Sequence, residues 1–313
     1  MRGPYREEVR VFAPATVSNL GSGFDVLGLA VRAPGDTVVA RRVPGVGVRI
    51  ARIEGDGGAL PREAARNTAG IAAAATLRRA GIDVGVELEV HKGMPVGTGL
   101  GSSAARAAAA ALAVNLLVGS PLRKAELVGP CVEAEGAVAG RHADNVAPAL
   151  LGGLVLVRSA SPAELVRLPV PEGMMVVVVT PAFELSTRLA REALPREVPL
   201  GEMVRNTAGI ATLVAACYAG DAALFGLGAT DRTVTPVRAR LIPGCEAVMA
   251  AAMAAGAVGS SISGSGPSVF ALSHSPRRAE AIARAMTAAF RDAGGLESTY
   301  LISPADCPGA RRV

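Results

Sequence analysis

A glycine-rich segment that leads directly into a helix of small residues constrains this chain more than any other feature. It reads MPVGTGLGSSAA from Met94 to Ala105, and the helix is expected over Arg106 to Val118. The glycines at 97, 99 and 101 have no Cβ, so backbone N–H groups can approach an anion there. A helix that begins near Ser102 adds free N–H donors and the positive end of its dipole. The segment therefore predicts a phosphate-binding loop rather than an ordinary helix start, for which a single serine cap would suffice.

This loop differs from two better-known phosphate-binding motifs. A P-loop needs a lysine directly after its last glycine, and no lysine follows these glycines. The spacing Gly99-x-Gly101-x-x-Ala104 fits a relaxed dinucleotide-binding pattern, which also needs a tight turn and an acidic residue about 20 positions later. Here the loop after the expected strand Val84–His91 is long, and Ala108–Gly119 carries no charge. The segment therefore belongs to neither class.

The first half of the chain alternates between apolar strands and alanine-rich helices, which predicts an α+β protein. After the phosphate-loop helix, Ser120 and Pro121 form a good N-cap and N1 pair, so a further helix is expected to begin there. The other expected elements are strands at Val9–Phe12, Asp36–Arg42, Val46–Ile53, Val84–His91 and Leu154–Arg158, and a helix at Asn67–Ala80.

The second half predicts a separate domain. Proline, serine and glycine cluster at Ser159–Pro162 and Pro169–Gly173, so the boundary is expected near Ala163, between domains 1–162 and 163–313. The continuous apolar run Met174–Thr180 predicts a buried central strand. Helices are then expected at Met203–Ala219, Gly244–Ala255 and Pro276–Ala293, with strands at Val258–Ser263, Ser268–Ser273 and Glu297–Ile302. Strand, helix, strand, strand, helix, strand is a ferredoxin-like order.

Composition excludes several functional classes. A formal charge of +5 and 3% aromatic residues without tryptophan offer little to nucleic acid, which needs a clustered basic face or stacking platforms. Apolar stretches such as Val248–Val258 fall short of the roughly 18 residues that a membrane span requires, and the first ten residues lack a signal-peptide core. Four dispersed cysteines favour neither a zinc site nor a disulfide framework. We therefore expect a cytoplasmic enzyme without nucleic-acid or membrane partners.

Three segments together resemble the GHMP superfamily of small-molecule kinases. They are PATVSNLGSGFD at Pro14–Asp25, PVGTGLGSSA at Pro95–Ala104, and SGSGPS at Ser263–Ser268. The segment NLGSGFD, together with HADNVAP at His142–Pro148, is most similar to the branch of the superfamily that acts on L-homoserine. The resemblance implies a ribosomal-S5-like N-terminal domain that binds ATP and a ferredoxin-like C-terminal domain. It also implies transfer of the γ-phosphoryl group of ATP to the side-chain hydroxyl of L-homoserine in threonine synthesis, with Mg²⁺ as cofactor, and a homodimer.

The resemblance also assigns residues to the nucleotide. The phosphate loop would wrap the triphosphate with Pro95, Val96, Gly97, Thr98, Gly99, Leu100, Gly101, Ser102, Ser103, Ala104 and Ala105. Ser102, or else Ser103, would give a hydroxyl to Mg²⁺, and Glu135 would supply the carboxylate. Glu133 is the alternative, because Glu135 lies seven residues before His142 where the family pattern has eight. Asn67, at the start of a helix, would form a wall of the adenine pocket.

The amino-acid pocket implied by the resemblance contains Asn19, Asp25, His142 and Asn145. Asp25 would pair with the substrate ammonium, and Asn145 would hydrogen-bond the reacting hydroxyl. The alternative readings are a turn cap for Asp25 and a buried structural histidine for His142.

A free amino acid also carries a carboxylate, whose natural partner is an arginine. Thr187, Arg191 and Arg238 match the family's substrate segments, with Arg232 as the alternative to Arg238, and Arg191 joins Asn145 as a catalytic candidate. Two other functions stay open. A shikimate or mevalonate type of kinase would keep the loop and change the pocket, whereas a non-catalytic sensor would lose the metal carboxylate.

Overall fold

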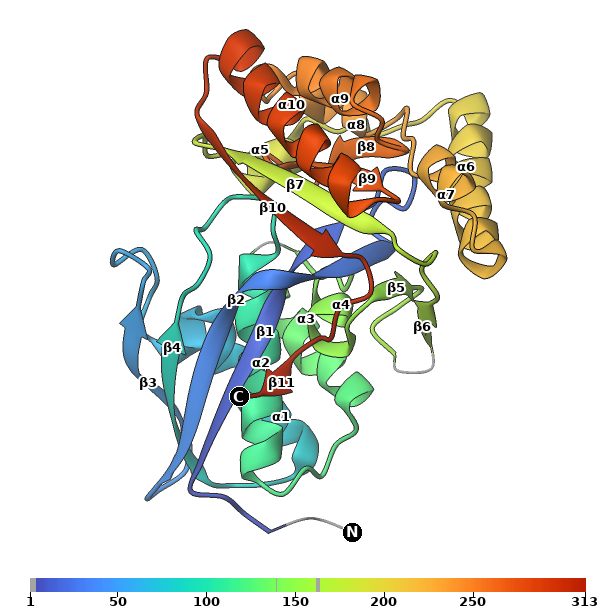
Figure 1. Ribbon diagram of the computed structural model, residues 1–313. Coiled ribbons are helices and arrows are strands. Elements are labelled where there is room, and N and C mark those ends of the chain that lie inside the picture. Colours follow the sequence, from blue (N-terminus) through green and yellow to red (C-terminus); the bar gives the residue numbers. More distant parts are fainter. Residues whose placement is uncertain (1–3, 139, 162–163) are drawn as a thin grey trace.

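A mixed sheet of seven strands forms the N-terminal part of the molecule (Figure 1). The computed structural model describes residues 4–138, 140–161 and 164–313. Five strands follow the order β11-β1-β2-β4-β3, β5 pairs with β2, and β6 pairs with β5. Among the strand pairs within the described residues of this sheet, β3 and β4 are parallel and the others are antiparallel. The strands are β1 (Glu8–Ser18), β2 (Leu27–Val43), β3 (Gly47–Glu54), β4 (Gly85–His91), β5 (Leu154–Val157), β6 (Leu165–Leu168) and β11 (Arg311–Arg312).

One alanine-rich helix lies at the centre of the N-terminal part. Helix α2 (Ser102–Leu117) contacts β1 and β2 on one side and α1 (Thr68–Ala80) on another. Ala107–Ala111 are fully buried, and such small side chains let strands and helices approach the helix from several directions. Helices α3 (Val128–Gly136) and α4 (Val146–Leu151) complete this layer. The start of α2 is thereby fixed on a rigid support.

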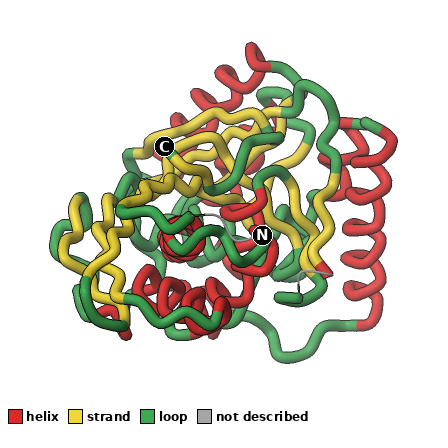
Figure 2. The backbone as a smooth tube through the Cα atoms, turned by 90° about the horizontal axis from the view of Figure 1, so that it is seen from below, coloured by secondary structure: helices red, strands yellow, loops and turns green. Residues whose placement is uncertain are grey.

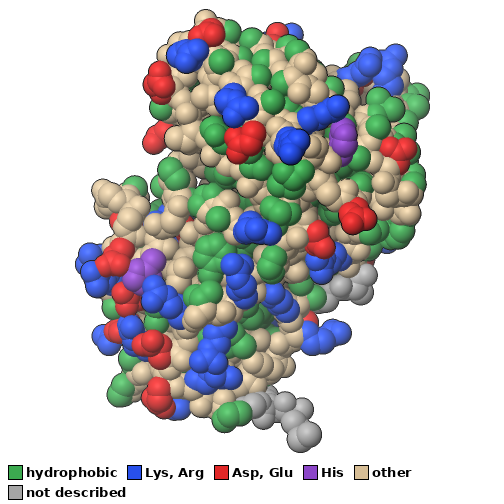
Figure 3. Space-filling model, viewed as in Figure 1, with side chains coloured by type: hydrophobic (Ala, Val, Ile, Leu, Met, Phe, Trp, Pro, Cys, Tyr) green, Lys and Arg blue, Asp and Glu red, His purple; other side chains and the backbone are tan. Residues whose placement is uncertain are grey.

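The opposite side of the N-terminal sheet carries ion pairs between neighbouring strands. Arg41 of β2 contacts Glu89 of β4 at 2.9 Å, and His91 of β4 contacts Glu54 of β3 at 2.7 Å. Over β3 and β4, Figure 3 shows basic, acidic and histidine side chains mixed on the surface. Charges of both signs suit a solvated sheet face and form no single-sign patch.

The C-terminal part contains a four-stranded antiparallel sheet in the order β10-β7-β9-β8. Its strands are β7 (Met175–Pro181), β8 (Gly259–Ile262), β9 (Val269–Ser273) and β10 (Ser298–Pro304). This is the predicted ferredoxin-like order, with α9 (Cys245–Ala254) and α10 (Pro276–Gly294) on one face. Along β7, Val177 and Val179 pack with these helices, whereas Val176 and Val178 join the core of the N-terminal part. Both faces are buried, which confirms the prediction of a central strand.

Four further helices lie between β7 and α9 in the chain. They are α5 (Thr187–Glu192), α6 (Leu200–Ala219), α7 (Ala222–Gly228) and α8 (Thr235–Ala239). Helices α6 and α7 stand at one edge of the molecule (Figures 1 and 2). No helix within the described ranges is long and apolar enough to span a membrane.

Two expectations about local structure were wrong. Strands β1 and β2 extend well beyond Val9–Phe12 and Asp36–Arg42, because Pro14 lies at a register shift within a continuing strand pair rather than at a strand end. Ser120 does not open a helix. Its φ is 57° and its N–H donates to Asn115 O at 2.7 Å, so it closes α2, while α3 begins only at Val128 after a 3₁₀ turn.

The expected domain boundary near Ala163 lies outside the described residues. Strand β6 and the C-terminal strand β11, which both follow that position, pair into the first sheet. The chain therefore completes the first sheet with β6 after that position and returns to it with β11 after building the second sheet. The division at residue 163 stays a prediction. The two-domain α+β architecture itself agrees with the prediction.

Candidate active site

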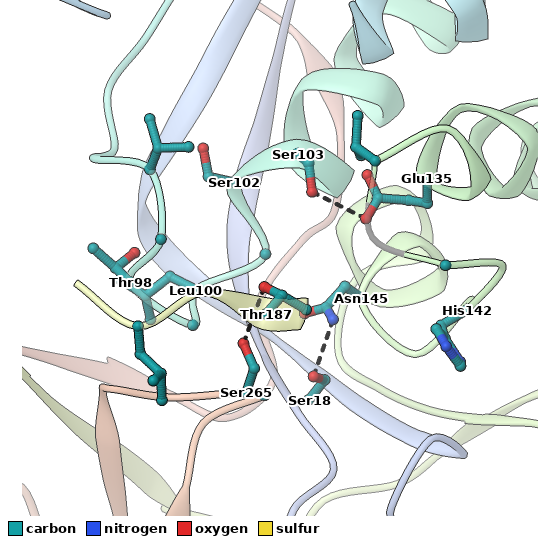
Figure 4. Close-up of a pocket in the computed structure, with 18 of the residues that line it drawn as sticks. Ser18, Thr98, Leu100, Ser102, Ser103, Glu135, His142, Asn145, Thr187 and Ser265 are labelled. Carbon is teal, nitrogen blue, oxygen red and sulfur yellow. Dashed lines mark hydrogen bonds between the residues drawn. The ribbon is translucent and has the colours of Figure 1, made fainter. Parts of the chain in front are cut away.

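A cavity of about 410 Å³ lies where the phosphate loop meets α3, α4, α5 and the turn between β8 and β9. Figure 4 shows the labelled side chains converging on it from these segments. The expected residues that line it are Asn19, Asp25, Val96, Gly97, Thr98, Gly99, Leu100, Gly101, Ser102, Ser103, Glu135, His142, Asn145, Thr187, Arg191 and Arg238. Most of the residues singled out by sequence thus lie around one space.

The phosphate loop needs its glycines for two reasons. Gly97, Gly99 and Gly101 all have positive φ, between 65° and 76°. A Cβ on Gly101 would lie 2.2 Å from Thr16 Oγ1, and one on Gly99 would lie 2.5 Å from Ser263 O. Backbone conformation therefore favours glycine at all three positions, and close packing also excludes a side chain at Gly99 and Gly101.

The two serines at the start of α2 have different partners. Ser103 Oγ donates to Glu135 Oε2 at 3.0 Å, as Figure 4 shows. Ser102 Oγ accepts a hydrogen bond from Lys92 Nζ, which also pairs with the buried carboxylate of Asp36. The sharing of one metal ion by Ser102 and Glu135 stays a prediction, and Ser103 is the serine in contact with Glu135.

Lys92 and Asp36 lie behind Ser102 without lining the cavity, and the sequence did not reveal this support of the site. Lys92 precedes the glycines, whereas the lysine of a P-loop follows them, and Asp36 is 56 residues away in sequence. Both side chains are almost fully buried. A lysine at the end of an apolar strand was the one available signal, because such a residue needs a buried partner.

The two candidate glutamates lie in different environments. Glu133 is half exposed and pairs with Arg78 at 2.7 Å, and it does not line the cavity. Glu135 lines the cavity, and its burial raises the pKa of the carboxyl group to about 7. Glu135 Oε1 has no hydrogen-bond partner among the described residues. An unpaired carboxylate oxygen next to a serine hydroxyl fits the oxygen ligands that Mg²⁺ prefers.

Opposite charges pair at the other end of the cavity. Arg191 donates to both carboxylate oxygens of Asp25, at 2.8 and 3.0 Å. Its Nη2 also lies 3.1 Å from His142 Nε2, and His142 Nδ1 lies 3.6 Å from Asp25 Oδ2. The ring of Phe24 lies 5.2 Å from the guanidinium carbon of Arg191 and 5.3 Å from that of Arg238. His142 and Asp25 are therefore members of a charged cluster and not isolated structural residues.

Two asparagines are held rigidly in this region. Asn145 accepts a hydrogen bond from Thr16 Oγ1 at 2.7 Å and donates to Ser18 Oγ at 3.0 Å. Asn19 has a φ of 74° and donates to Gly264 O at 2.8 Å. Asp25 also has positive φ, at 60°. Strained backbone at several non-glycine residues in one loop is typical of functional sites.

Arg238, and not Arg232, lines the cavity. It is 3% exposed, donates to Gly264 O at 2.8 Å, and burial lowers the pKa of its guanidinium group to about 10. Asp144 also lines the cavity although the sequence did not single it out. Burial and the nearby charge of Asp25 raise the pKa of the Asp144 carboxyl to about 6.

Four expected nucleotide residues do not line this cavity. Pro95, the first of the expected loop residues, is exposed outside the cavity, and Ala104 and Ala105 are buried inside α2. Asn67 caps α1, since its Oδ1 accepts the N–H of Ala69 at 3.0 Å and its Nδ2 donates to Pro61 O. A contact between Asn67 and adenine stays a prediction.

The turn between β8 and β9 packs directly on the phosphate loop. Ser263 Oγ donates to Gly99 O at 2.7 Å, and Ser268 Oγ donates to Thr98 O at 2.5 Å. Ser265 Oγ lies 3.3 Å from Thr187 Oγ1 of α5 (Figure 4). The segment is a hairpin turn that also joins the second sheet to the phosphate loop.

Comparisons with known proteins agree with this geometry. The family described as GHMP kinases N terminal domain matches residues 67–153, and GHMP kinases C terminal matches residues 213–292. The chain is 46% identical to a homoserine kinase of Arabidopsis thaliana, covering 99% of this chain and 86% of that protein. It is 43% identical to a homoserine kinase of Xylella fastidiosa (strain 9a5c), covering 98% and 95%.

Solved structures extend the comparison. A crystal structure of homoserine kinase from Cytophaga hutchinsonii superposes with a TM-score of 0.94 at 43% identity, covering 100% of this chain and 99% of that one. An L. major mevalonate kinase superposes with a TM-score of 0.71 at 18% identity, a likeness of fold alone. By sequence, fold and cavity, this chain belongs to the homoserine kinases of the GHMP kinase family.

Proposed function

We propose that this protein transfers the γ-phosphoryl group of ATP to the side-chain hydroxyl of L-homoserine. The observation that carries the proposal is one cavity with a phosphate-binding loop at one end and the Asp25–Arg191 pair at the other. Phosphoryl transfer needs the two substrates aligned and their charge neutralised more than it needs covalent chemistry by the protein. A cavity with these two ends fits a nucleotide and an amino acid side by side.

The charged end suits a free amino acid. Its ammonium group would pair with Asp25 and its carboxylate with Arg191, so the substrate replaces one ion pair by two of the same kind. Arg238 adds a buried cation beside the half-buried Arg191, and Thr187 and Asn19 add polar contacts. A zwitterion site of this composition discriminates against molecules that leave one of its charges unpaired.

At the phosphate end, the N–H groups at the start of α2 and around the three glycines would bind the triphosphate. Glu135 and a serine hydroxyl, with Ser103 in contact and Ser102 nearby, are the residues that would hold Mg²⁺. When bound with ATP, Mg²⁺ neutralises charge on the phosphate oxygens. We propose that Asn145, fixed by Thr16 and Ser18, positions the reacting hydroxyl.

The test is release of ADP from Mg-ATP with L-homoserine, L-threonine, L-serine, shikimate and mevalonate, and identification of each product by mass. We expect turnover with L-homoserine. Shikimate and mevalonate carry a carboxylate without an ammonium group, so they would leave Asp25 unpaired. Preferred turnover of either acid would reject the amino-acid pocket, and absence of turnover with every acceptor would favour a sensor on the same fold.

We further propose that the protein acts in the cytoplasm, which is supported by four free cysteines that are all buried. The expected homodimer stays a prediction. Sedimentation velocity at micromolar concentration tests it, because a monomer of 31.5 kDa and its dimer sediment differently.

A further inference from the structure

One buried cation at the phosphate end has no role in the reaction described so far. Arg106 lies one turn after the start of α2, lines the cavity and is 4% exposed. Its Nε donates to Thr68 Oγ1 at 2.9 Å, and Thr68 Oγ1 in turn lies 3.3 Å from Ser103 O. Through Thr68 the guanidinium group is therefore fixed relative to the serines of the phosphate loop.

The guanidinium group of Arg106 lacks a full set of hydrogen-bond partners among the described residues. Its Nη1 makes no hydrogen bond to any residue that the structure describes, and Arg106 forms no ion pair within those residues. Thr98 Oγ1 and Glu135 Oε1 are also buried, unpartnered in the described ranges, and part of the same cavity wall. Unpaired buried polar atoms are rare in folded proteins, and several along one wall indicate a missing ligand.

The chemistry of the missing ligand follows from the charge balance. A buried guanidinium group needs a negative counter-charge, and the nearest candidates are Asp36 and Glu135. Asp36 is paired with Lys92, and Glu135 accepts a hydrogen bond from Ser103 and forms no ion pair with Arg106 among the described residues. If Glu135 binds a metal ion, its charge is no longer available to Arg106. A phosphate group carried by that metal ion would supply the counter-charge at the same place.

We infer that Arg106 binds a phosphate oxygen of the nucleotide through Nη1. The helix that supplies backbone N–H donors then also supplies a side-chain cation, which is the chemical part that a lysine plays in a P-loop. The inference rests on the proposed function only in that a nucleotide occupies this cavity. It does not depend on which hydroxyl accepts the phosphoryl group.

The experiment measures binding rather than turnover. Calorimetric titrations measure the affinities of wild type, Arg106→Met and Arg106→Lys for Mg-ADP and for adenosine. Loss of a hydrogen bond to a charged group should weaken the binding of Mg-ADP to Arg106→Met about 10- to 100-fold. The affinity for adenosine should stay within about twofold of wild type, because adenosine has no phosphate group. The affinity of Arg106→Lys for Mg-ADP should lie between those of wild type and Arg106→Met, because lysine keeps the positive charge and lacks the planar guanidinium group.

A matched control variant removes an arginine charge at a position away from the cavity. Arg49 lies on the outer face of β3 with its side chain 67% exposed, so Arg49→Met should bind Mg-ADP as wild type does. If Arg106→Met folds poorly, Arg106→Lys decides, since its Mg-ADP affinity should still fall several-fold without loss of adenosine affinity. The KM for L-homoserine should stay within about twofold in the lysine variant.

Three outcomes would overturn the inference. They are unchanged affinity for Mg-ADP in Arg106→Met with no change in thermal stability, unchanged affinity with a change in thermal stability alone, and equal weakening of Mg-ADP and adenosine binding. Each would mean that Arg106 does not contact a phosphate oxygen. A failure of the proposed function looks different. Wild type would then bind Mg-ADP in an Arg106-dependent manner and yet not phosphorylate L-homoserine.

Discussion

The substitution Asp144→Asn should change how the stability of this protein depends on pH. Asp144 is 3% exposed, and its burial together with the nearby charge of Asp25 raises the pKa of its carboxyl from 3.8 to about 6. Because the folded state holds this proton more tightly than the unfolded state, the group stabilises the fold below about pH 4. That contribution is lost as the pH rises through 6.

The magnitude follows from the shift. Roughly two pKa units, at about 1.4 kcal/mol per unit, give a contribution of about 3 kcal/mol. Asparagine has nearly the same shape and carries no charge at any pH. At each pH, we take the free energy of unfolding of Asp144→Asn minus that of wild type. This difference should increase by up to about 3 kcal/mol between pH 4 and pH 7.5.

Urea unfolding of both proteins at half-unit steps from pH 4 to 7.5 measures this difference. Titrating groups far from Asp144 are common to both proteins and cancel. Glu135 is different, because the charge of Asp144 contributes to its raised pKa of about 7. Loss of that charge lowers the Glu135 pKa in the variant and changes the stability in the same direction. The exposed Asp306, changed to Asn, is the control and should show a small difference that does not follow this course. A difference between wild type and Asp144→Asn that is constant over this range, or that changes in the opposite direction, would refute the reasoning.

Three further substitutions test the site. Asn145→Ala should lower kcat about 100-fold with KM within threefold, because it removes a donor from the reacting hydroxyl; a change mainly in KM would contradict this role. Arg191→Ala should raise the KM for L-homoserine about 30- to 100-fold and leave the KM for ATP nearly unchanged in steady-state kinetics, and wild-type kinetics would exclude Arg191 from the pocket. Gly101→Ala should abolish Mg-ADP binding in calorimetry, because the new Cβ would lie 2.2 Å from Thr16 Oγ1, and binding at wild-type strength would reject the close packing of the loop.

Features carried by a continuous stretch of sequence were predicted well. The glycine-rich turn, the start of α2 at Ser102 and the central strand β7 all depend on local residue types: glycines, of which Gly101 is the N-cap of α2, and a run of valines. The boundaries of β1 and β2 were predicted poorly, because Pro14 and Gly35 look like strand breaks locally and are accommodated by pairing with a neighbouring strand. Local patterns cannot include a partner that lies elsewhere in the chain.

Contacts between distant segments account for what the sequence did not reveal in the site. Lys92 meets Asp36 across 56 residues, and Thr16 and Ser18 hold Asn145 across 129 and 127 residues. Each of these side chains alone is an ordinary polar residue. Only the fold shows that they contact the motif residues Ser102 and Asn145. Arg106 is a similar case, because in the sequence it is one of many arginines and only the fold places it in the cavity wall.

The two ends of the cavity share one structural element, the turn between β8 and β9. Ser263 donates to Gly99 O on the nucleotide side, while Asn19 and Arg238 both donate to Gly264 O on the amino-acid side. A shift of this turn would therefore alter the phosphate loop and the amino-acid pocket together. The bonds to Gly264 O hold the backbone of the turn, whereas the bond to Gly99 O depends on the side chain of Ser263. The alignment of the two substrates thus depends on the contact between the second sheet and the phosphate loop as much as on the residues that touch either substrate.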